Sequence, residues 1–177
     1  MKKLLSAVVL GASIASILGA PLSSQAMAQT EGNVLRGLSQ FQLSIETFGE
    51  YANCGLTKDL VRDAVLSAAS GAPFQVTAES NKGNGPRADA TLYVKINTLA
   101  FDSNFCVTHI MVDAYEKQSV ILNSSRRQIS ADVDLWDEGS GMGASSAAEH
   151  PAYVAQMIGK YVRKFINEWN LDNRGEK

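Results

Sequence analysis

The sequence predicts a two-layer α+β sandwich in which two helices cover one face of a mostly antiparallel sheet. Four segments alternate apolar and polar residues with the period of a strand, and a fifth, shorter segment also reads as a strand. Two further segments carry apolar residues at helical spacing, which gives the order β-α-β-β-β-β-α. Two amphipathic helices need an apolar surface to cover, and one face of a sheet supplies it.

The first strand and the first helix have clear local signals. Apolar and polar residues alternate from Phe41 onward, as in a half-buried strand. A helix is predicted over 58–69, because Thr57 is a good N-cap and apolar residues recur every three or four positions. Pro73 cannot continue this helix, and residues 74–78 then read as a short second strand.

Three longer strands are predicted in the second half of the chain. Residues 81–89 have strong turn chemistry, and residues 92–97, 109–115 and 129–136 then alternate between apolar and polar side chains. Short connections favour antiparallel neighbours among these strands. Residues 139–149 are rich in glycine, serine and alanine, and we expect them to form a flexible linker.

The last predicted element is an amphipathic helix with the cleanest periodicity in the chain. Pro151 suits the first helical position, and apolar residues at steps of three and four continue to Trp169. We expect this stripe to pack on the sheet. No internal repeat or second domain is evident, so residues 29–177 are predicted to form one domain, with a loosely ordered lead-in over 29–38 and a polar tail over 172–177.

Residues 1–28 are predicted to be a secretory signal peptide that is cleaved. Lys2 and Lys3 precede an uncharged apolar run. Within residues 26–28, alanines occupy the two positions at which signal peptidase requires small residues. Residues 24–26 offer a second acceptable site. A retained membrane anchor is the alternative, but this run is short and diluted by glycine and serine. We therefore expect a periplasmic or secreted protein.

The mature chain would contain two cysteines, Cys54 and Cys106. An even number in an exported chain favours a disulfide over two buried free thiols. Neither cysteine lies near the predicted cleavage site, so no lipid anchor is expected. Removing Lys2 and Lys3 from the 16 basic residues leaves 14 against 18 acidic ones. No basic block is present, which argues against nucleic acid or an anionic membrane as a partner.

The strand alternation also predicts which residues a partner could reach. If the apolar residues of the long strands face the helices, the opposite face carries aromatic, histidine, methionine and acidic side chains. The predicted partner-binding residues are Tyr93, His109, Met111, Asp113, Tyr115, Asp132, Asp134 and Trp136. Exposed aromatic groups often mark a contact surface, although an ordinary solvated face, or one covered by the lead-in or by residues 139–149, is the alternative.

Residues that could support chemistry are sparse. His109, Asp113, Asp132 and Asp134 could gather as a metal site, yet they would lie on adjacent strands with no preformed loop. We therefore expect no metal and no other cofactor. A histidine base would need a nucleophile on a fixed turn, which the sequence does not offer, and His150 is more simply a residue at a helix start. The sequence thus predicts no enzyme.

Two segments carry a resemblance to a known family. Residues 88–96 (ADATLYVKI) and residues 132–139 (DVDLWDEG) resemble the amino-terminal domain of TolB and the related periplasmic activator domains of penicillin-binding proteins. The shared features are a strand that follows a loop, then a hairpin, and a later strand that ends near a tryptophan. The resemblance covers about half of the mature chain and implies a non-enzymatic envelope module that binds other proteins, with no catalytic residue to transfer.

These observations give two functional hypotheses. The first is a non-catalytic exported module of the cell envelope that binds or scaffolds another envelope protein and has no stable membrane insertion after cleavage. The alternative is a periplasmic protein that binds a small ligand or a metal ion through the exposed sheet face.

Overall fold

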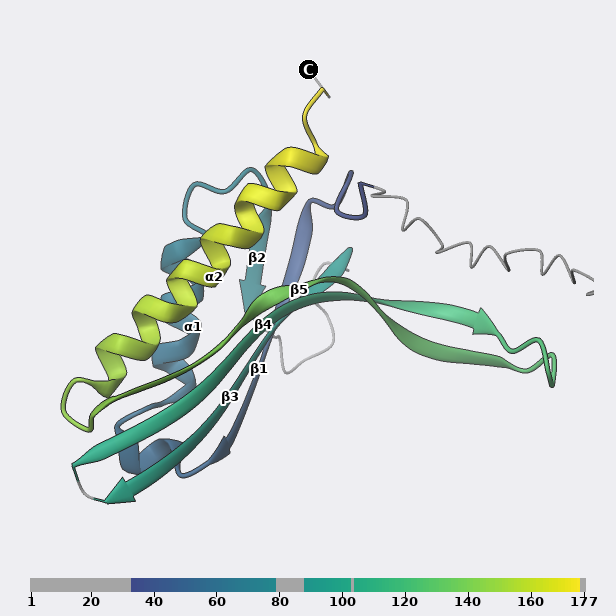
Figure 1. Ribbon diagram of the computed structural model, residues 1–177. Coiled ribbons are helices and arrows are strands. Elements are labelled where there is room, and N and C mark those ends of the chain that lie inside the picture. The colour runs from purple at the N-terminus through teal and green to yellow at the C-terminus, as the bar shows by residue number, and fades with distance from the viewer. Residues whose placement is uncertain (1–32, 79–87, 103, 176–177) are drawn as a thin grey trace, which may run out of the picture. The chain divides into compact units, whose positions relative to one another are not determined.

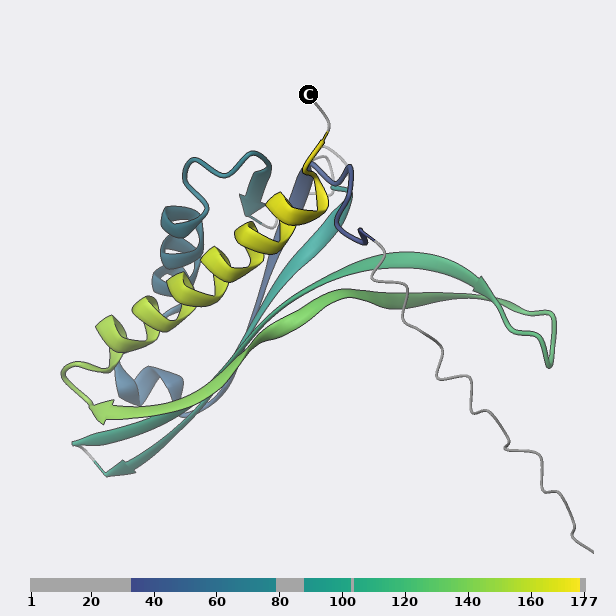
Figure 2. The same cartoon turned by 45° about the horizontal axis from the view of Figure 1, so that its top comes forward.

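A five-stranded sheet with the strand order β2-β1-β3-β4-β5 carries two helices on one face (Figure 1 and Figure 2). The computed structural model describes residues 33–78, 88–102 and 104–175. The predicted signal peptide at 1–28 and the first residues of the predicted lead-in lie outside these ranges. The predicted two-layer α+β sandwich is confirmed.

The sheet is mixed, and its long pairings are antiparallel. Its strands are β1 (Gln40–Gly49), β2 (Gln75–Ala78), β3 (Ala90–Asp102), β4 (Phe105–Ile121) and β5 (Gln128–Ser146). β1 pairs in parallel with β2 and with β3, whereas β3-β4 and β4-β5 are antiparallel. Because the antiparallel pairings join the three longest strands, the sheet is mostly antiparallel, as predicted.

Both helices form close to where the sequence predicts them. They are α1 (Lys58–Ala68) and α2 (His150–Asp172). The hydroxyl of Thr57 accepts a hydrogen bond from the Leu60 N–H at 3.1 Å, which is the predicted N-cap of α1. None of the helices in the described ranges is long and apolar enough to cross a membrane.

The core lies between the sheet and α2, and Phe165 is at its centre. Its fully buried ring makes edge contacts with the rings of Phe41, Phe74 and Trp136, at centroid distances of 5.2 to 5.5 Å. Other apolar residues of the α2 stripe, such as Val154, are also fully buried. The prediction that α2 packs on the sheet is therefore confirmed.

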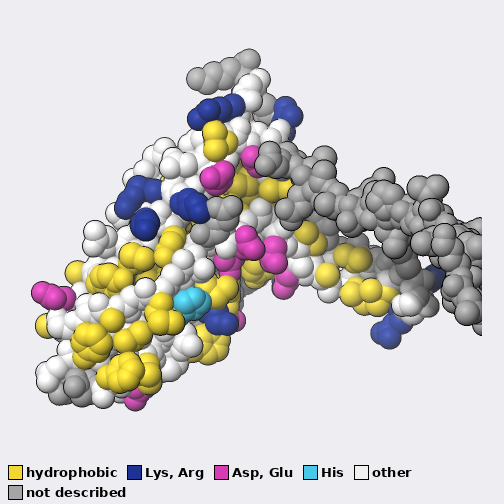
Figure 3. Space-filling model, in the orientation of Figure 1, with side chains coloured by type: hydrophobic (Ala, Val, Ile, Leu, Met, Phe, Trp, Pro, Cys, Tyr) yellow, Lys and Arg dark blue, Asp and Glu magenta, His cyan; other side chains and the backbone are white. Residues whose placement is uncertain are grey.

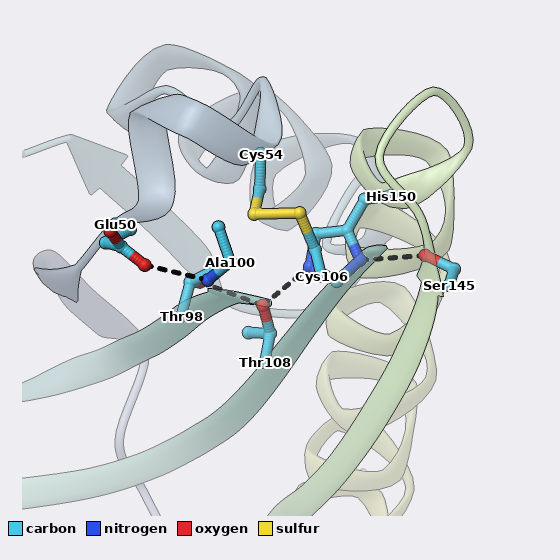
Figure 4. Close-up of a disulfide and its surroundings, with 8 residues drawn as sticks. All are labelled: Glu50, Cys54, Thr98, Ala100, Cys106, Thr108, Ser145 and His150. Atoms are coloured by element: carbon cyan, nitrogen blue, oxygen red, sulfur yellow. Dashed lines mark hydrogen bonds between the residues drawn. A yellow bond between two sulfur atoms is a disulfide. The ribbon is translucent and has the colours of Figure 1, made fainter. Parts of the chain in front are cut away.

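The two cysteines form the predicted disulfide. Cys54 is the last residue of the short 3₁₀ helix η1 (Tyr51–Cys54), and it is bonded to Cys106 near the start of β4, with the Cα atoms 6.1 Å apart (Figure 4). The bond closes a loop with a sequence separation of 52 residues. In the chain-entropy model a loop of that length stabilises the fold by about 4 kcal/mol.

The prediction of a flexible linker over 139–149 was wrong for its first part. Residues 139–146 continue β5, and glycine is present because α2 lies directly on the strand. A Cβ added at Gly141 would collide with the Tyr161 hydroxyl, and one added at Gly143 would collide with the Tyr153 hydroxyl. Glycine here is a requirement of close packing rather than a sign of flexibility.

The described part of the predicted lead-in contacts the end of α2. Leu35 is buried, and its N–H donates to the carboxylate of Asp172 at 3.0 Å. The indole N–H of Trp169 donates to the Leu38 carbonyl at 2.7 Å. These contacts hold residues 33–38 against the carboxy-terminal end of α2.

Candidate functional site

The candidate site is the side of the sheet that faces away from the helices, which we call the open face. The β3-β4 register places Tyr93 opposite Asp113 and Lys95 opposite Met111 on this face. Their neighbours along each strand point into the core, because successive residues of a strand face opposite sides. The strand alternation therefore defines the open face well in the centre of the sheet.

Five of the eight predicted partner-binding residues lie together on the open face. Tyr93, His109, Met111, Asp113 and Tyr115 occupy alternate positions of β3 and β4, and each is half-buried. All five have the orientation that the alternation predicts, and we call these five residues the central group.

Two other predicted residues lie farther along β5. Asp134 is paired with Tyr115, beside the central group, whereas Asp132 is paired with Lys117, beyond the end of β3. Both aspartates are exposed. The structure thus brings Asp134 to the central group and leaves Asp132 outside it.

The prediction that Trp136 is exposed was wrong. Its side chain is 7% exposed and its ring packs on Phe165 in the core. β5 has a register shift at this point, since Trp136 pairs with Ala114 while Asp134 pairs with the next residue, Tyr115. The extra residue on β5 is a β-bulge, and a one-residue shift turns the following side chains to the other face.

Two tyrosines and a glutamate form a polar and aromatic group on the open face. The rings of Tyr93 and Tyr115 make an edge contact with centroids 6.1 Å apart. The Tyr93 hydroxyl donates a hydrogen bond to the carboxylate of Glu46 on β1. Partial burial raises the pKa of Tyr93, and the hydrogen bond to Glu46 and then the charge of Glu46 raise it further. Tyr93 therefore keeps its proton and acts as a hydrogen-bond donor at any physiological pH.

Asp113 is the most unusual charged group on this face. Its Oδ1 atom is buried and has no hydrogen-bond partner among the described residues. Partial burial raises the pKa of Asp113, and the nearby carboxylates of Asp137 and Asp134 raise it further. Lys95 and His109 offset only part of this effect. One oxygen of the Asp113 carboxylate, Oδ1, is therefore left without a hydrogen-bond donor from the described residues.

An exposed apolar group lies at the end of the sheet where β3 joins β4 (Figure 3). We call it the apolar end, and it consists of Phe48, Leu99, Phe101, Phe105 and Met142. Their side chains are between 44% and 72% exposed. The rings of Phe101 and Phe105 lie 6.5 Å apart, and Met142 is paired with His109 in the β4-β5 register. The apolar end thus continues directly into the central group.

Sequence reasoning missed the apolar end, although a signal was present. Leu99 and Phe101 continue the odd-numbered positions of Tyr93 and Lys95, which are the positions that face away from the core. The predicted alternation covers residues 92–97 and assigns neither Leu99 nor Phe101 to a face. Large apolar residues at solvent-facing strand positions are the signal that would have found this group.

The possible metal site suggested by the sequence does not form within the described residues. No group of three or more histidine, cysteine, aspartate or glutamate side chains there is arranged to hold a metal ion. His109 lies opposite Asn97 and Met142 rather than opposite an acid. Asp132 lies opposite Lys117, away from Asp113.

A buried polar network beside the disulfide joins the start of α2 to the sheet (Figure 4). His150 is fully buried; its Nε2 lies 2.6 Å from the Thr108 hydroxyl and its Nδ1 lies 2.7 Å from the Ser145 hydroxyl. The Thr108 hydroxyl in turn lies 2.8 Å from that of Thr98. Burial lowers the pKa of His150, which favours the neutral ring.

This arrangement resembles a serine-histidine pair but has a structural role. The His150 ring has no exposed surface for a substrate, and both of its nitrogens are occupied by hydroxyl groups. A neutral imidazole with one donor and one acceptor satisfies both contacts. His150 is therefore a residue that anchors the start of a helix, which agrees with its predicted position.

Comparison with known proteins adds no relative from which a function could be transferred. No protein-family model matches the chain, and no curated protein is similar enough to it to count as a match. The chemistry of the open face is therefore the basis for a functional proposal.

Proposed function

We propose that this protein is an exported, non-catalytic module of the cell envelope that binds another protein through its open face. The observation that carries this proposal is the apolar end, where three phenylalanines, a leucine and a methionine are exposed together on one side of the sheet. Contiguous exposed apolar groups with a polar surround are characteristic of protein-binding surfaces. Aromatic side chains are also the residues that contribute most to such contacts.

The chemistry of the open face suggests what the partner carries. The apolar end would bury an apolar segment, and covering one phenylalanine contributes about 1.5–3 kcal/mol. Asp134 and Asp137, which are exposed beside Asp113, would accept hydrogen bonds from a lysine or arginine of the partner. We therefore expect a partner with an apolar patch next to a basic residue.

The disulfide supports the proposed location. Disulfides persist in oxidising compartments such as the periplasm, and the Cys54–Cys106 bond agrees with the export predicted from residues 1–28. The resemblance of residues 88–96 and 132–139 to TolB-type envelope domains supports the same assignment. We propose a periplasmic or secreted location on these grounds.

Site-specific photocrosslinking in living cells tests the proposal directly. A photoreactive phenylalanine analogue at Phe101 or Met142 should give a discrete crosslinked product with another protein, whereas the same group at Gln156, exposed on α2, should not. The double variant F101S/F105S should lose a product formed from position 142. Equal products from both faces, or none from the open face, would contradict the proposal.

A further inference from the structure

β4 and β5 continue together beyond the end of the sheet. The last pairing of β3 with β4 is Thr91 with Tyr115, but β4 and β5 remain paired as far as Ile121 and Gln128. We call residues 116–133 the arm; Figure 1 and Figure 2 show it extending away from the sheet. Within the described ranges no third strand pairs with it.

The arm has features of an incomplete sheet. Val120 is paired with Ile129, and Ala131 and Val133 follow on the same side of the ribbon. Gln118 and Glu116 lie opposite these last two residues, so this side is apolar along β5 and polar along the base of β4. An isolated two-stranded ribbon is only marginally stable in water, whereas three or more strands with a common apolar face are stable. The outer edge of β5 in the arm also presents backbone groups that no described strand pairs with.

The charges of the arm are separated along its length. Arg126 and Arg127 lie at the exposed tip, and no acidic residue occurs between positions 118 and 131. The base of the arm is mostly acidic: Glu116 and Asp132 lie there with one basic residue, Lys117. Asp134 and Asp137 follow beside Asp113. Among the described residues no ion pair joins either arginine to an acidic side chain.

The tip and the base of one arm are too far apart to neutralise each other. Seven residues of extended strand separate Arg127 from Asp134, which corresponds to roughly 24 Å. Charges in salt solution are screened over about 8 Å at physiological ionic strength. A second arm that lies antiparallel beside the first would bring each basic tip to an acidic base.

We infer that two copies of this chain pair through the β5 edges of their arms, antiparallel about a twofold axis. The two ribbons then form one four-stranded sheet in which the apolar residues of the two β5 strands lie side by side on one face. The arginines of each tip contact the aspartates at the base of the other copy. This inference shares Asp134 and Asp137 with the proposed function, whereas the β5 edge, Arg126 and Arg127 belong to it alone.

The geometry restricts the register of such a pairing. Two residues that lie opposite each other in an antiparallel pair point to the same face of the sheet, whereas neighbours along a strand point to opposite faces. The twofold axis must therefore pass through a position at which a residue lies opposite the same residue of the other copy. With Ser130 on the axis, Gln128, the first residue of β5, lies opposite Asp132, and Ile129 lies opposite Ala131. With Ala131 on the axis, Ile129 lies opposite Val133. In both registers the tip that carries Arg126 and Arg127 lies beside the acidic base of the other copy.

Charge reversal at each end of the arm tests the inference. Sedimentation velocity of the exported, disulfide-bonded chain should show a reversible dimer that weakens as salt is raised. Each of the variants R126D/R127D and D134K/D137K should raise the dimer dissociation constant by roughly tenfold to a hundredfold, because every tip-to-base contact becomes repulsive. Aspartate tolerates the positive φ of 51° at position 126, so the turn should persist.

Mixing the two variants provides the decisive control. An acidic tip then meets a basic base and a basic tip meets an acidic base, so a one-to-one heterodimer should form although neither variant dimerises well alone. The variant K160D/R163D, with the same change of charge on the exposed side of α2, should dimerise like the parent. Failure of the mixture to dimerise, or dimers that resist both reversals, would overturn the inference.

Disulfide crosslinking identifies the edge. Single cysteines are placed at position 130 and, separately, at position 131. One of these two variants should form a covalent dimer, because the residue on the twofold axis lies opposite the same residue of the other copy. A cysteine in place of Ser119, which lies on β4 and is paired with Ser130, should not. Crosslinking at 119 alone, a chain that stays monomeric at millimolar concentration, or a monomer whose tip arginines bind anionic vesicles instead would each overturn the inference.

Discussion

Replacing Asp113 with asparagine should make this protein more stable. The carboxylate is partly buried, one of its oxygens has no hydrogen-bond partner among the described residues, and two further carboxylates lie nearby. Asparagine keeps the shape of the side chain, removes the charge and supplies an amide donor. Removal of an unfavourable charge commonly stabilises a protein by about 0.5–2 kcal/mol, and we expect about 1 kcal/mol here.

The gain should depend on pH in a defined direction. The pKa of Asp113 is raised in the folded state, so the folded protein binds this proton more tightly than the unfolded chain does. The charge therefore lowers stability at pH values above the folded pKa, and this effect disappears below the ordinary value of 3.8. The advantage of D113N over the parent should be full near neutral pH and should vanish in acid.

Urea unfolding of the parent and of D113N, near neutral pH and again in acid, measures the difference in their free energies of unfolding. For a domain of this size, 1 kcal/mol corresponds to a shift of about 2–4 °C in melting temperature. The variant D134N is the matched control, because Asp134 is exposed and its removal should stabilise less. If D113N is less stable than the parent at neutral pH, or if its advantage does not change with pH, Asp113 is not an unsatisfied carboxylate.

Three further results are expected. Phe165→Ala should lower the free energy of unfolding by about 3–5 kcal/mol, because the ring is fully buried among three other aromatic rings; an unchanged urea midpoint would show that α2 is not part of the core. His150 has a lowered pKa in the folded state, so its stabilising effect is complete above the ordinary value of 6.5 and is lost as the pH falls; comparison of the parent with His150→Gln should show a flatter pH profile in the variant. Replacing Cys54 and Cys106 with alanine should cost about 4 kcal/mol, measured by denaturation against the oxidised parent.

The sequence was sufficient to predict the segments whose structure depends on residues nearby in the chain. The cap at Thr57, the alternation through Tyr93 and the helical stripe around Phe165 all depend on neighbours within a few residues. Hydrophobic periodicity captures that kind of information. The fold class and the five central residues of the open face followed from it.

The failures occurred where a distant contact overrides the local pattern. The bulge near Trp136 depends on the space beside Phe165 and on Gly139, since a Cβ at position 139 would collide with the tryptophan ring. No property of residues 132–136 alone reveals it. The strand over residues 139–146 was missed because glycine favours loops in general and is required here only because tyrosines of α2 lie on it.

The glycines of β5 also restrict how this protein can evolve. The side chains of Tyr161 and Tyr153 occupy the space where a Cβ at positions 141 and 143 would lie. The size of each strand residue is therefore coupled to the size of the facing helix residue. A larger residue on the strand is tolerable only if the facing residue on the helix becomes smaller. In an alignment of homologous chains, positions 141 and 161 should therefore covary, and so should positions 143 and 153.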